Sequence, residues 1–202
     1  MNVDLLTLSS NDLYGPQGVG ALYIKKKTPI NPLLIGGGQE SGLRSGTEDV
    51  AGIVGMGEAA RISRSEMKTN SGRMLSLRDR LSSTILRTIP ESYLNGHSAQ
   101  RLPDNVNIRF RYIEGESILL TLDGLGVAVS SGSACTSKTL MPSHVLTAIG
   151  LPHEEAHGSI LFSLGRFTTQ EEIDYVTEQL PGIINNLRKL SPLTPPDLVK
   201  DK

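Results

Sequence analysis

The sequence contains one thiol whose surroundings favour reactivity. Cys135 is the only cysteine among 202 residues, which excludes an internal disulfide framework and any thiolate-rich zinc site. It lies in the run Ser130-Ser-Gly-Ser-Ala-Cys-Thr-Ser137, in which every neighbour is small, polar or flexible. Free cysteines are usually buried as small hydrophobes, but this run is typical of a loop that carries its sulfur outward. Lys138 and His144 follow closely enough in sequence to favour the thiolate, so we expect an accessible nucleophile at Cys135.

Two glycine-bearing loops are the next candidates for chemistry. The run Gly15–Gly20 lacks the spacing of the dinucleotide fingerprint and precedes a strand rather than a helix, so it predicts a turn between strands. The backbone N–H groups of residues 36–38, all glycine, could cradle an anion. With Arg44, Ser45 and Thr47 at the start of a helix, a phosphate site is one interpretation. A capped helix with a flexible lead-in explains the same residues equally well, and the pattern leaves both open.

The other titratable side chains do not form a recognisable metal site or acid/base site. The histidines at positions 97, 144, 153 and 157 show no metal-ligand spacing with acids or with the cysteine, so we expect ordinary surface or core positions for them. The pairs Glu154–Glu155 and Glu171–Glu172 look like solvated starts of helices rather than the paired carboxylates of an acid/base catalyst.

The composition excludes several classes of protein. A net charge of −1, from 21 acidic and 20 basic residues, provides no electrostatic footprint for nucleic acid. No apolar run approaches the length of about 18 residues that a membrane span needs. The opening MNVDLLTLSS lacks the basic region of a signal peptide. Because a single cysteine also suits a reducing compartment, we expect a cytoplasmic protein.

The glycine loops and the thiol need elements that position them, and the hydrophobic pattern predicts these. Short strands at residues 3–9 and 18–26 flank the first loop, and the first of them reads as buried. A helix over about residues 48–67 opens at Thr47 and carries several small residues, which allow close packing against a partner. A second, amphipathic helix is expected at residues 72–88.

Strands and helices alternate through the rest of the chain. The pattern predicts strands at residues 105–112, 127–130 and 158–165, and helices at residues 115–123 and 142–150. A final helix begins with a capping box from Thr168 to Glu171, and Pro181 should kink or break it. This alternation indicates α/β or α+β layers.

Taken in chain order, the loops and elements resemble the cysteine desulfurases of the NifS/IscS type, within the class V aminotransferase superfamily. The matching segments are SSNDLYGPQGVGALYIKK, GGGQESGLRSGTEDVAGIVGMGEAA, EGESILLTLD, SSGSACTSKTLMPSHVL and AHGSILFSLGRFTTQEEID. They span nearly all of the chain and correspond to the C-terminal half of a family member. The resemblance implies an α/β fold, the C-terminal part of a fold-type I transferase that depends on pyridoxal phosphate (PLP). Residues 1–67 would end the large PLP-binding domain, and residues 68–202 would form the small α+β domain that carries the cysteine loop.

The resemblance also implies roles for individual positions. Cys135 matches the cysteine that attacks the substrate sulfur and becomes a persulfide. Ser9 matches a hydroxyl that contacts the phosphate of PLP, and Asn11 stands at the position of a histidine in the same loop. Thr47 matches a hydroxyl that reaches the PLP phosphate of the neighbouring subunit, which implies a homodimer.

Two positions depart from the family patterns Ser-x-His-Lys-x-Tyr-Gly-Pro and Ser-Ile-Arg-Phe. Asp12 stands where the family's lysine forms the Schiff base with PLP, and a carboxylate has no amine to condense with an aldehyde. Leu161 stands where the family presents an arginine to the substrate carboxylate, so a bidentate guanidinium is lost. Both changes affect the handling of free cysteine by PLP, whereas the thiol loop is intact.

These observations support one leading hypothesis and two alternatives. The leading hypothesis is a cysteine-desulfurase-like protein of iron–sulfur cluster assembly whose lysine-dependent PLP chemistry is lost or weakened. In it, Cys135 accepts sulfur as a persulfide or ligates an iron–sulfur cluster shared with a scaffold protein. The first alternative is an active PLP enzyme that converts cysteine to alanine and enzyme-bound sulfur, completed by a separate N-terminal half. The second is a non-catalytic interaction module or a truncated remnant.

Overall fold

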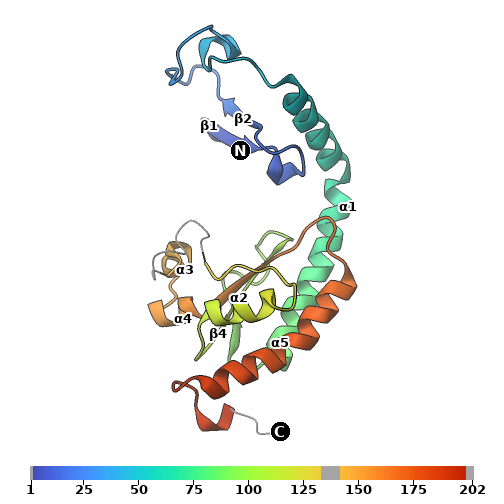
Figure 1. Ribbon diagram of the computed structural model, residues 1–202, viewed down its shortest axis with the longest axis vertical. Coiled ribbons are helices and arrows are strands. Elements are labelled where there is room, and N and C mark those ends of the chain that lie inside the picture. The colour runs from blue at the N-terminus through green and yellow to red at the C-terminus, as the bar shows by residue number, and fades with distance from the viewer. Residues whose placement is uncertain (1, 133–141, 199–202) are drawn as a thin grey trace. The chain divides into compact units, whose positions relative to one another are not determined.

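The chain divides into two compact units, Met1–Lys68 and Thr69–Lys202, each built on its own antiparallel sheet (Figure 1). The structure, a computed structural model, describes residues 2–132 and 142–198. We describe the two units separately.

The first unit is built on two antiparallel strands. β1 (Leu5–Ser9) pairs with β2 (Gly20–Ile24), so that Ser9 lies opposite Gly20 and Leu5 opposite Ile24. Both strands lie within the ranges that the sequence predicts. The expectation that the first strand is buried is wrong, because Leu5 and Leu8 are 47% and 44% exposed. A sheet of two strands pairs each strand along one edge only and covers little side-chain surface.

α1 (Val50–Thr88) is a single helix of 39 residues that begins in the first unit and continues into the second. The prediction of two helices, at residues 48–67 and 72–88, is therefore wrong about the break between them. The intervening residues contain no proline, and a glycine such as Gly72 inside a helix costs only about 1 kcal/mol. The helical hydrogen-bond ladder can continue through such a segment.

The second unit is built on three antiparallel strands in the order β3-β4-β5. Their bounds are Ser92–Leu94, Asn105–Phe110 and Ser159–Ser163. β4 and β5 lie within predicted strands, and alternate residues of β4 are buried, as its pattern predicts. The predicted strand at residues 127–130 is reduced to one bridge, between Ser130 and Leu161. The sequence analysis missed β3, which is too short to show a period.

Within the described residues, the second unit also contains the α-helices α2 (Gly115–Asp123), α3 (His144–Ala148), α4 (His153–His157) and α5 (Gln170–Leu190). α2 has the predicted bounds. The capping box of α5 lies one residue later than predicted, at Thr169 and Glu172, whose reciprocal hydrogen bonds are 3.2 and 2.9 Å long. Pro181 does not end α5, because buried residues on both sides of it, Leu180, Ile183 and Ile184, hold the helix against the core.

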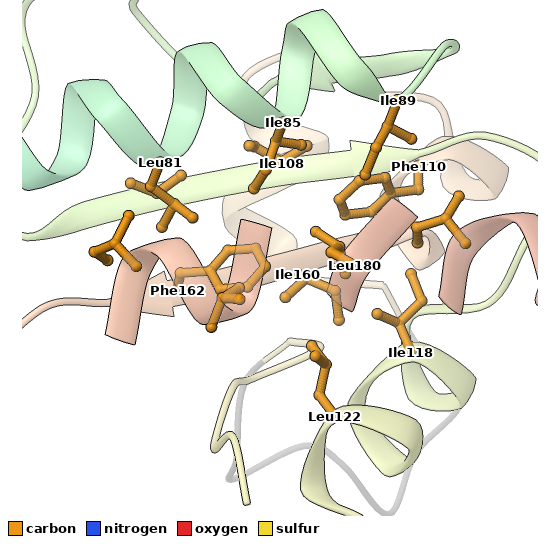
Figure 2. Packing of buried hydrophobic residues seen from close by; sticks show 14 of the residues in the cluster. Leu81, Ile85, Ile89, Ile108, Phe110, Ile118, Leu122, Ile160, Phe162 and Leu180 are labelled. Atoms are coloured by element: carbon orange, nitrogen blue, oxygen red, sulfur yellow. The ribbon is translucent and has the colours of Figure 1, made fainter. Parts of the chain in front are cut away.

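A hydrophobic core fills the space between one face of this sheet and the helices. The side chains labelled in Figure 2 come from α1, α2, α5 and the two longer strands, with Ile89 directly after α1: Leu81, Ile85, Ile89, Ile108, Phe110, Ile118, Leu122, Ile160, Phe162 and Leu180. Full burial of one such aliphatic or aromatic side chain contributes about 1.5–3 kcal/mol. The opposite face of the sheet carries Asn107, Arg109 and Leu161, because alternate residues of a strand point to opposite faces.

Candidate functional site

Three of the candidate cofactor residues lie together in the loop between β1 and β2. Ser9 ends β1, and Asn11 and Asp12 begin a short 3-10 turn, η1 (Asn11–Leu13). All three side chains are exposed. The loop is closed by a hydrogen bond in which the Ser10 N–H donates to the Val19 carbonyl at 2.9 Å, and the Ser10 carbonyl accepts two further N–H groups. The sequence therefore correctly predicts a strand that ends at Ser9 and a turn that contains Asn11 and Asp12.

The glycines of α1 hold this loop by close packing, as the small residues of that helix predict. A Cβ atom added to Gly52 would lie 2.2 Å from Val19 Cγ2, and one added to Gly55 would lie 2.5 Å from Pro16 Cγ. No side chain fits at such distances, so only glycine allows the helix to approach the loop this closely. The loop that carries Asp12 is thereby seated on α1 through its second half, residues 16–19.

The loop offers no amine at the position of Asp12. The next lysines along the chain, Lys25–Lys27, follow the opposite end of β2, because Gly20 pairs with Ser9 whereas Ile24 pairs with Leu5. Five residues of strand, at about 3.4 Å each, separate Gly20 from Lys25 by roughly 17 Å. Lys25 Nζ also lies 3.1 Å from the Asp4 carboxylate. These lysines therefore cannot take the place of a lysine at position 12.

Ser10 is a feature of this loop that the sequence analysis missed. Its side chain is fully buried, and its hydroxyl has no hydrogen-bond partner among the residues that the structure describes. The hydroxyl is directed at Gly15, where an added Cβ atom would lie only 2.3 Å from Ser10 Oγ. A turn residue between Ser9 and Asn11 gives no signal of burial in sequence.

We expect Ser10→Ala to stabilise the protein by about 1–3 kcal/mol, because it removes a buried hydroxyl that makes no hydrogen bond. Urea denaturation followed by circular dichroism measures the change. Ser9→Ala is the matched control, since its hydroxyl is exposed and its removal should leave the unfolding midpoint nearly unchanged. A loss of stability in Ser10→Ala would contradict this prediction.

The second glycine loop is hydrogen-bonded to itself. The Gly38 N–H, a candidate anion donor, donates to Ser45 Oγ at 3.3 Å, and the Gly46 N–H donates to Gln39 Oε1 at 3.1 Å. Arg44 Nη1 donates to the Ser45 carbonyl at 2.5 Å. Of the residues proposed to bind an anion here, Ser45 and Arg44 thus serve the loop itself. This geometry favours the interpretation as the lead-in to a capped helix, although the lead-in is hydrogen-bonded rather than flexible as expected.

Thr47 lies in this lead-in rather than at the helix start. The helix opens at Val50, and the cap is Asp49, whose Oδ1 accepts the Gly52 N–H at 3.1 Å. Thr47 is exposed, and its hydroxyl makes no hydrogen bond with the described residues of the loop between β1 and β2, the hairpin loop. Its hydroxyl is therefore available to a group outside this unit.

In the second unit, Leu161 of β5 lies between Asn107 and Ser130, the first residue of the run that contains Cys135. It pairs with Asn107 of β4 on one side. On the other side it exchanges two backbone hydrogen bonds with Ser130, of 3.1 and 2.7 Å. Cys135 itself lies in residues 133–141, outside the described residues. The structure thus locates the start of the run, at Ser130, beside Leu161, one of the two positions that depart from the family pattern quoted above.

The acids and histidines around this region are only partly as expected. Glu154 is exposed, but Glu155 is not a solvated acid: its carboxylate lies 2.8 Å from Arg109 Nε. The His153 and His157 rings lie 5.2 Å apart on α4. Among the described residues, no group of three or more histidines, acids or cysteines could hold a metal ion. No described helix has the length and apolar character to cross a membrane.

Comparison with known proteins shows the family to which the chain belongs. The aminotransferase class-V family matches residues 1–176, and the chain belongs to that family. Its similar proteins are cysteine desulfurases: it is 57% identical over 193 residues to cysteine desulfurase IscS 1 of Archaeoglobus fulgidus, and 53% identical over 195 residues to cysteine desulfurase IscS of Methanosarcina thermophila. Both alignments cover 96% of this chain, but only 50% and 48% of the relatives. The chain therefore spans about half the length of the curated relatives that it matches.

Solved structures give the same result. The chain is similar to a NifS-like protein with a TM-score of 0.82 and 35% identity, over 92% of this chain and 47% of that one. A NifS-like protein from Rickettsia africae matches with a TM-score of 0.80 and 32% identity, over 90% of this chain and 47% of that one. The predicted fold class is confirmed: the chain has the mixed α/β fold of about half of a NifS-like, PLP-dependent enzyme.

The described residues fit PLP only in part. Ser9 and Thr47 present exposed hydroxyls of the kind that bind a phosphate. A covalent bond to the PLP aldehyde needs an amine, however, and the hairpin loop presents the amide of Asn11 and the carboxylate of Asp12. The buried hydroxyl of Ser10 is directed at Gly15 and not outward. The loop therefore does not fit a covalently held PLP.

Proposed function

We propose that the chain is a cysteine-desulfurase-like protein of iron–sulfur cluster assembly that handles sulfur through Cys135 and has lost lysine-dependent PLP chemistry. The observation that carries this proposal is the acid at position 12, in an exposed loop whose nearest following lysines are at the far end of the hairpin. Leu161, in place of an arginine, supports it, because an aliphatic side chain cannot orient a substrate carboxylate. The relatives, named as cysteine desulfurases, support the link to sulfur.

The step that remains for this chain is a transfer of sulfur to a thiol. The Cys135 thiolate attacks the outer sulfur of a persulfide donor, R–S–SH. A new S–S bond forms at Cys135, the S–S bond of the donor breaks, and the donor leaves as a thiol after taking up the proton. No external oxidant or reductant is needed, because the transferred sulfur keeps its oxidation state. As the alternative use of the same thiolate, Cys135 would ligate an iron–sulfur cluster shared with a scaffold protein.

Two partners belong to this proposal. One is a scaffold protein that receives sulfur or shares a cluster. The other is a second copy of the chain, because Thr47 matches a hydroxyl that serves the neighbouring subunit and is exposed here.

A second candidate function is an active PLP enzyme completed by a separately supplied N-terminal half. The observation that favours it is the set of apolar side chains that the hairpin leaves exposed: Leu5, Leu8, Leu22 and Tyr23. A further polypeptide that packs against the faces of this sheet would cover them. This candidate predicts alanine formation from cysteine when PLP and such a half are both present.

Sulfur uptake by the isolated chain tests the leading proposal. The chain is incubated with glutathione persulfide, alkylated and analysed by mass spectrometry of the peptide that contains Cys135. We expect the gain of one sulfur atom per chain, since Cys135 is the only cysteine. Retention of an unmodified thiol under conditions in which a small thiol takes up sulfur would reject the persulfide role.

A further inference from the structure

α4 presents two histidines on one face. The run His153-Glu-Glu-Ala-His157 places them at positions i and i+4 of the helix, and such residues lie one above the other on the same face. A helix offers two imidazoles to a zinc ion with this His-Glu-x-x-His spacing. The sequence analysis missed the pairing, because it compared the histidines with acids and the cysteine only and predicted no helix at residues 153–157.

The two rings stand at a separation that suits a shared metal ion. Their centroids are 5.2 Å apart and their planes are tilted by 59°. A metal ion about 2.1 Å from one nitrogen of each ring lies roughly 3.2 Å from each centroid, and coordination angles between square and tetrahedral then place the centroids roughly 4.5–5.3 Å apart. The observed separation lies within this range, so the pair has the spacing of a bidentate chelate.

Neither ring is engaged elsewhere in the part of the chain that the structure describes. His153 is exposed and His157 is half-buried, and apart from their contact with each other they have no hydrogen bond or ion pair there. A neutral imidazole has one acceptor nitrogen, and in both rings it remains available. His97 differs, because its Nδ1 accepts two backbone N–H groups, at 3.0 and 2.9 Å.

α4 is held by contacts that leave the histidines free. Gly158 follows the helix directly, and the Phe110 N–H donates to the Gly158 carbonyl at 2.8 Å. A Cβ atom added to Gly158 would collide with the Phe110 carbonyl oxygen, so only glycine allows the helix end to approach β4 this closely. The buried side chain of Ala156 and the ion pair between Glu155 and Arg109 hold the same turn. The fold therefore presents the two rings from a fixed turn of helix.

The surroundings of the pair favour a cation. His157 lines a hollow of about 520 Å³ together with Glu114 and Glu116, at the start of α2. Within residues 2–132 and 142–198, these two carboxylates and that of Glu154 make no ion pair. Uncompensated negative charge raises the local concentration of cations. Because the described residues form no group of three metal ligands, we infer that these acids act through their charge and not as ligands.

We propose that His153 and His157 form a two-histidine chelate for a divalent transition-metal ion, Cu²⁺, Ni²⁺ or Zn²⁺, on one face of α4. Imidazole nitrogen suits these ions, whereas Mg²⁺ and Ca²⁺ prefer oxygen ligands. A catalytic zinc site has three protein ligands, and the described chain provides two here, so the site binds a metal ion and does not form a hydrolytic centre. Water completes the coordination. The proposal does not depend on the sulfur chemistry of Cys135.

Nickel binding tests the site. The chain, without a purification tag, is treated with iodoacetamide, which blocks its single thiol as a competing ligand. Isothermal titration with NiCl₂ should show one ion bound per chain. We expect His153→Ala and His157→Ala each to raise the dissociation constant at least about tenfold, because a chelate that loses one of its two ligands binds through a single imidazole.

His144→Ala is the matched control. It removes an exposed histidine at the start of α3, outside the pair, and should leave the dissociation constant unchanged. Nickel binding of normal strength in both His153→Ala and His157→Ala overturns the proposal. A loss of equal size in His144→Ala does the same, because it would show that nickel associates with histidines in general.

NMR of the unsubstituted protein decides the question if an alanine variant does not fold. Ni²⁺ is paramagnetic, and at less than one equivalent it should broaden the imidazole resonances of His153 and His157 together, before those of His97 and His144. Equal broadening of all four histidines would overturn the proposal.

Discussion

Cys135→Ser is expected to abolish sulfur uptake. The variant should lower the rate of reaction with glutathione persulfide by at least about 100-fold, because a serine hydroxyl is almost fully protonated at neutral pH and is a far weaker nucleophile than a thiolate. The measurement is mass spectrometry of the intact chain after incubation with the persulfide. The expected product is unmodified protein at every time point.

The control for this variant is Ser137→Ala, in the same run of small residues. It leaves the thiol in place and should take up sulfur at the rate of the unsubstituted protein. Persistent uptake in Cys135→Ser would show that the sulfur resides elsewhere on the chain, and the role proposed for Cys135 would then be wrong. Uptake at the normal rate by both Cys135→Ser and Ser137→Ala would likewise show that Cys135 is not the residue that takes up the sulfur.

Asp12→Lys has the second large effect, a gain rather than a loss. With PLP and borohydride, the variant should acquire a stable covalent pyridoxyl group at residue 12, because lysine supplies the amine that a carboxylate lacks. In the unsubstituted protein, peptide mapping should find no such group in the peptide that contains Asp12. The exposure of Asp12 in η1 indicates that the longer side chain fits without disturbing the loop.

Asn11→Lys is the matched control for Asp12→Lys. It places an equally exposed amine one residue earlier in the same turn. If position 12 retains a directed cofactor site, Asp12→Lys should be labelled roughly tenfold more than Asn11→Lys, because orientation and not mere exposure then governs the reaction. Equal labelling of the two variants would show that the loop has lost the site as well as its lysine.

Local patterns predicted the elements that carry their own signal in a short stretch of chain. α2 has the predicted bounds, and β4 alternates as predicted, because an amphipathic helix and a half-buried strand show their periods within six to nine residues. The predictions failed where the outcome depends on partners outside the stretch. Pro181 was expected to kink or break α5; the helix is not broken there, because buried neighbours on both sides hold it against the core.

The candidate site shows the same division between features of residue type and features that depend on distant contacts. The cysteine, the acid at position 12 and the leucine at position 161 are matters of residue type, so the sequence alone determined which reactive groups these positions offer. No arrangement of the chain makes an amine of Asp12. The absence of a lysine in the hairpin loop therefore needs no coordinates.

Only the tertiary structure decided where the ordinary polar residues lie and which partners they contact. Glu155 reads as one of two adjacent solvated acids, yet it pairs with Arg109, 46 positions away, while Glu154 remains exposed. Ser10 reads as a turn residue, yet its hydroxyl is buried against Gly15. Burial and ion pairing depend on which distant segments the fold brings together, and a linear pattern contains no record of those distances.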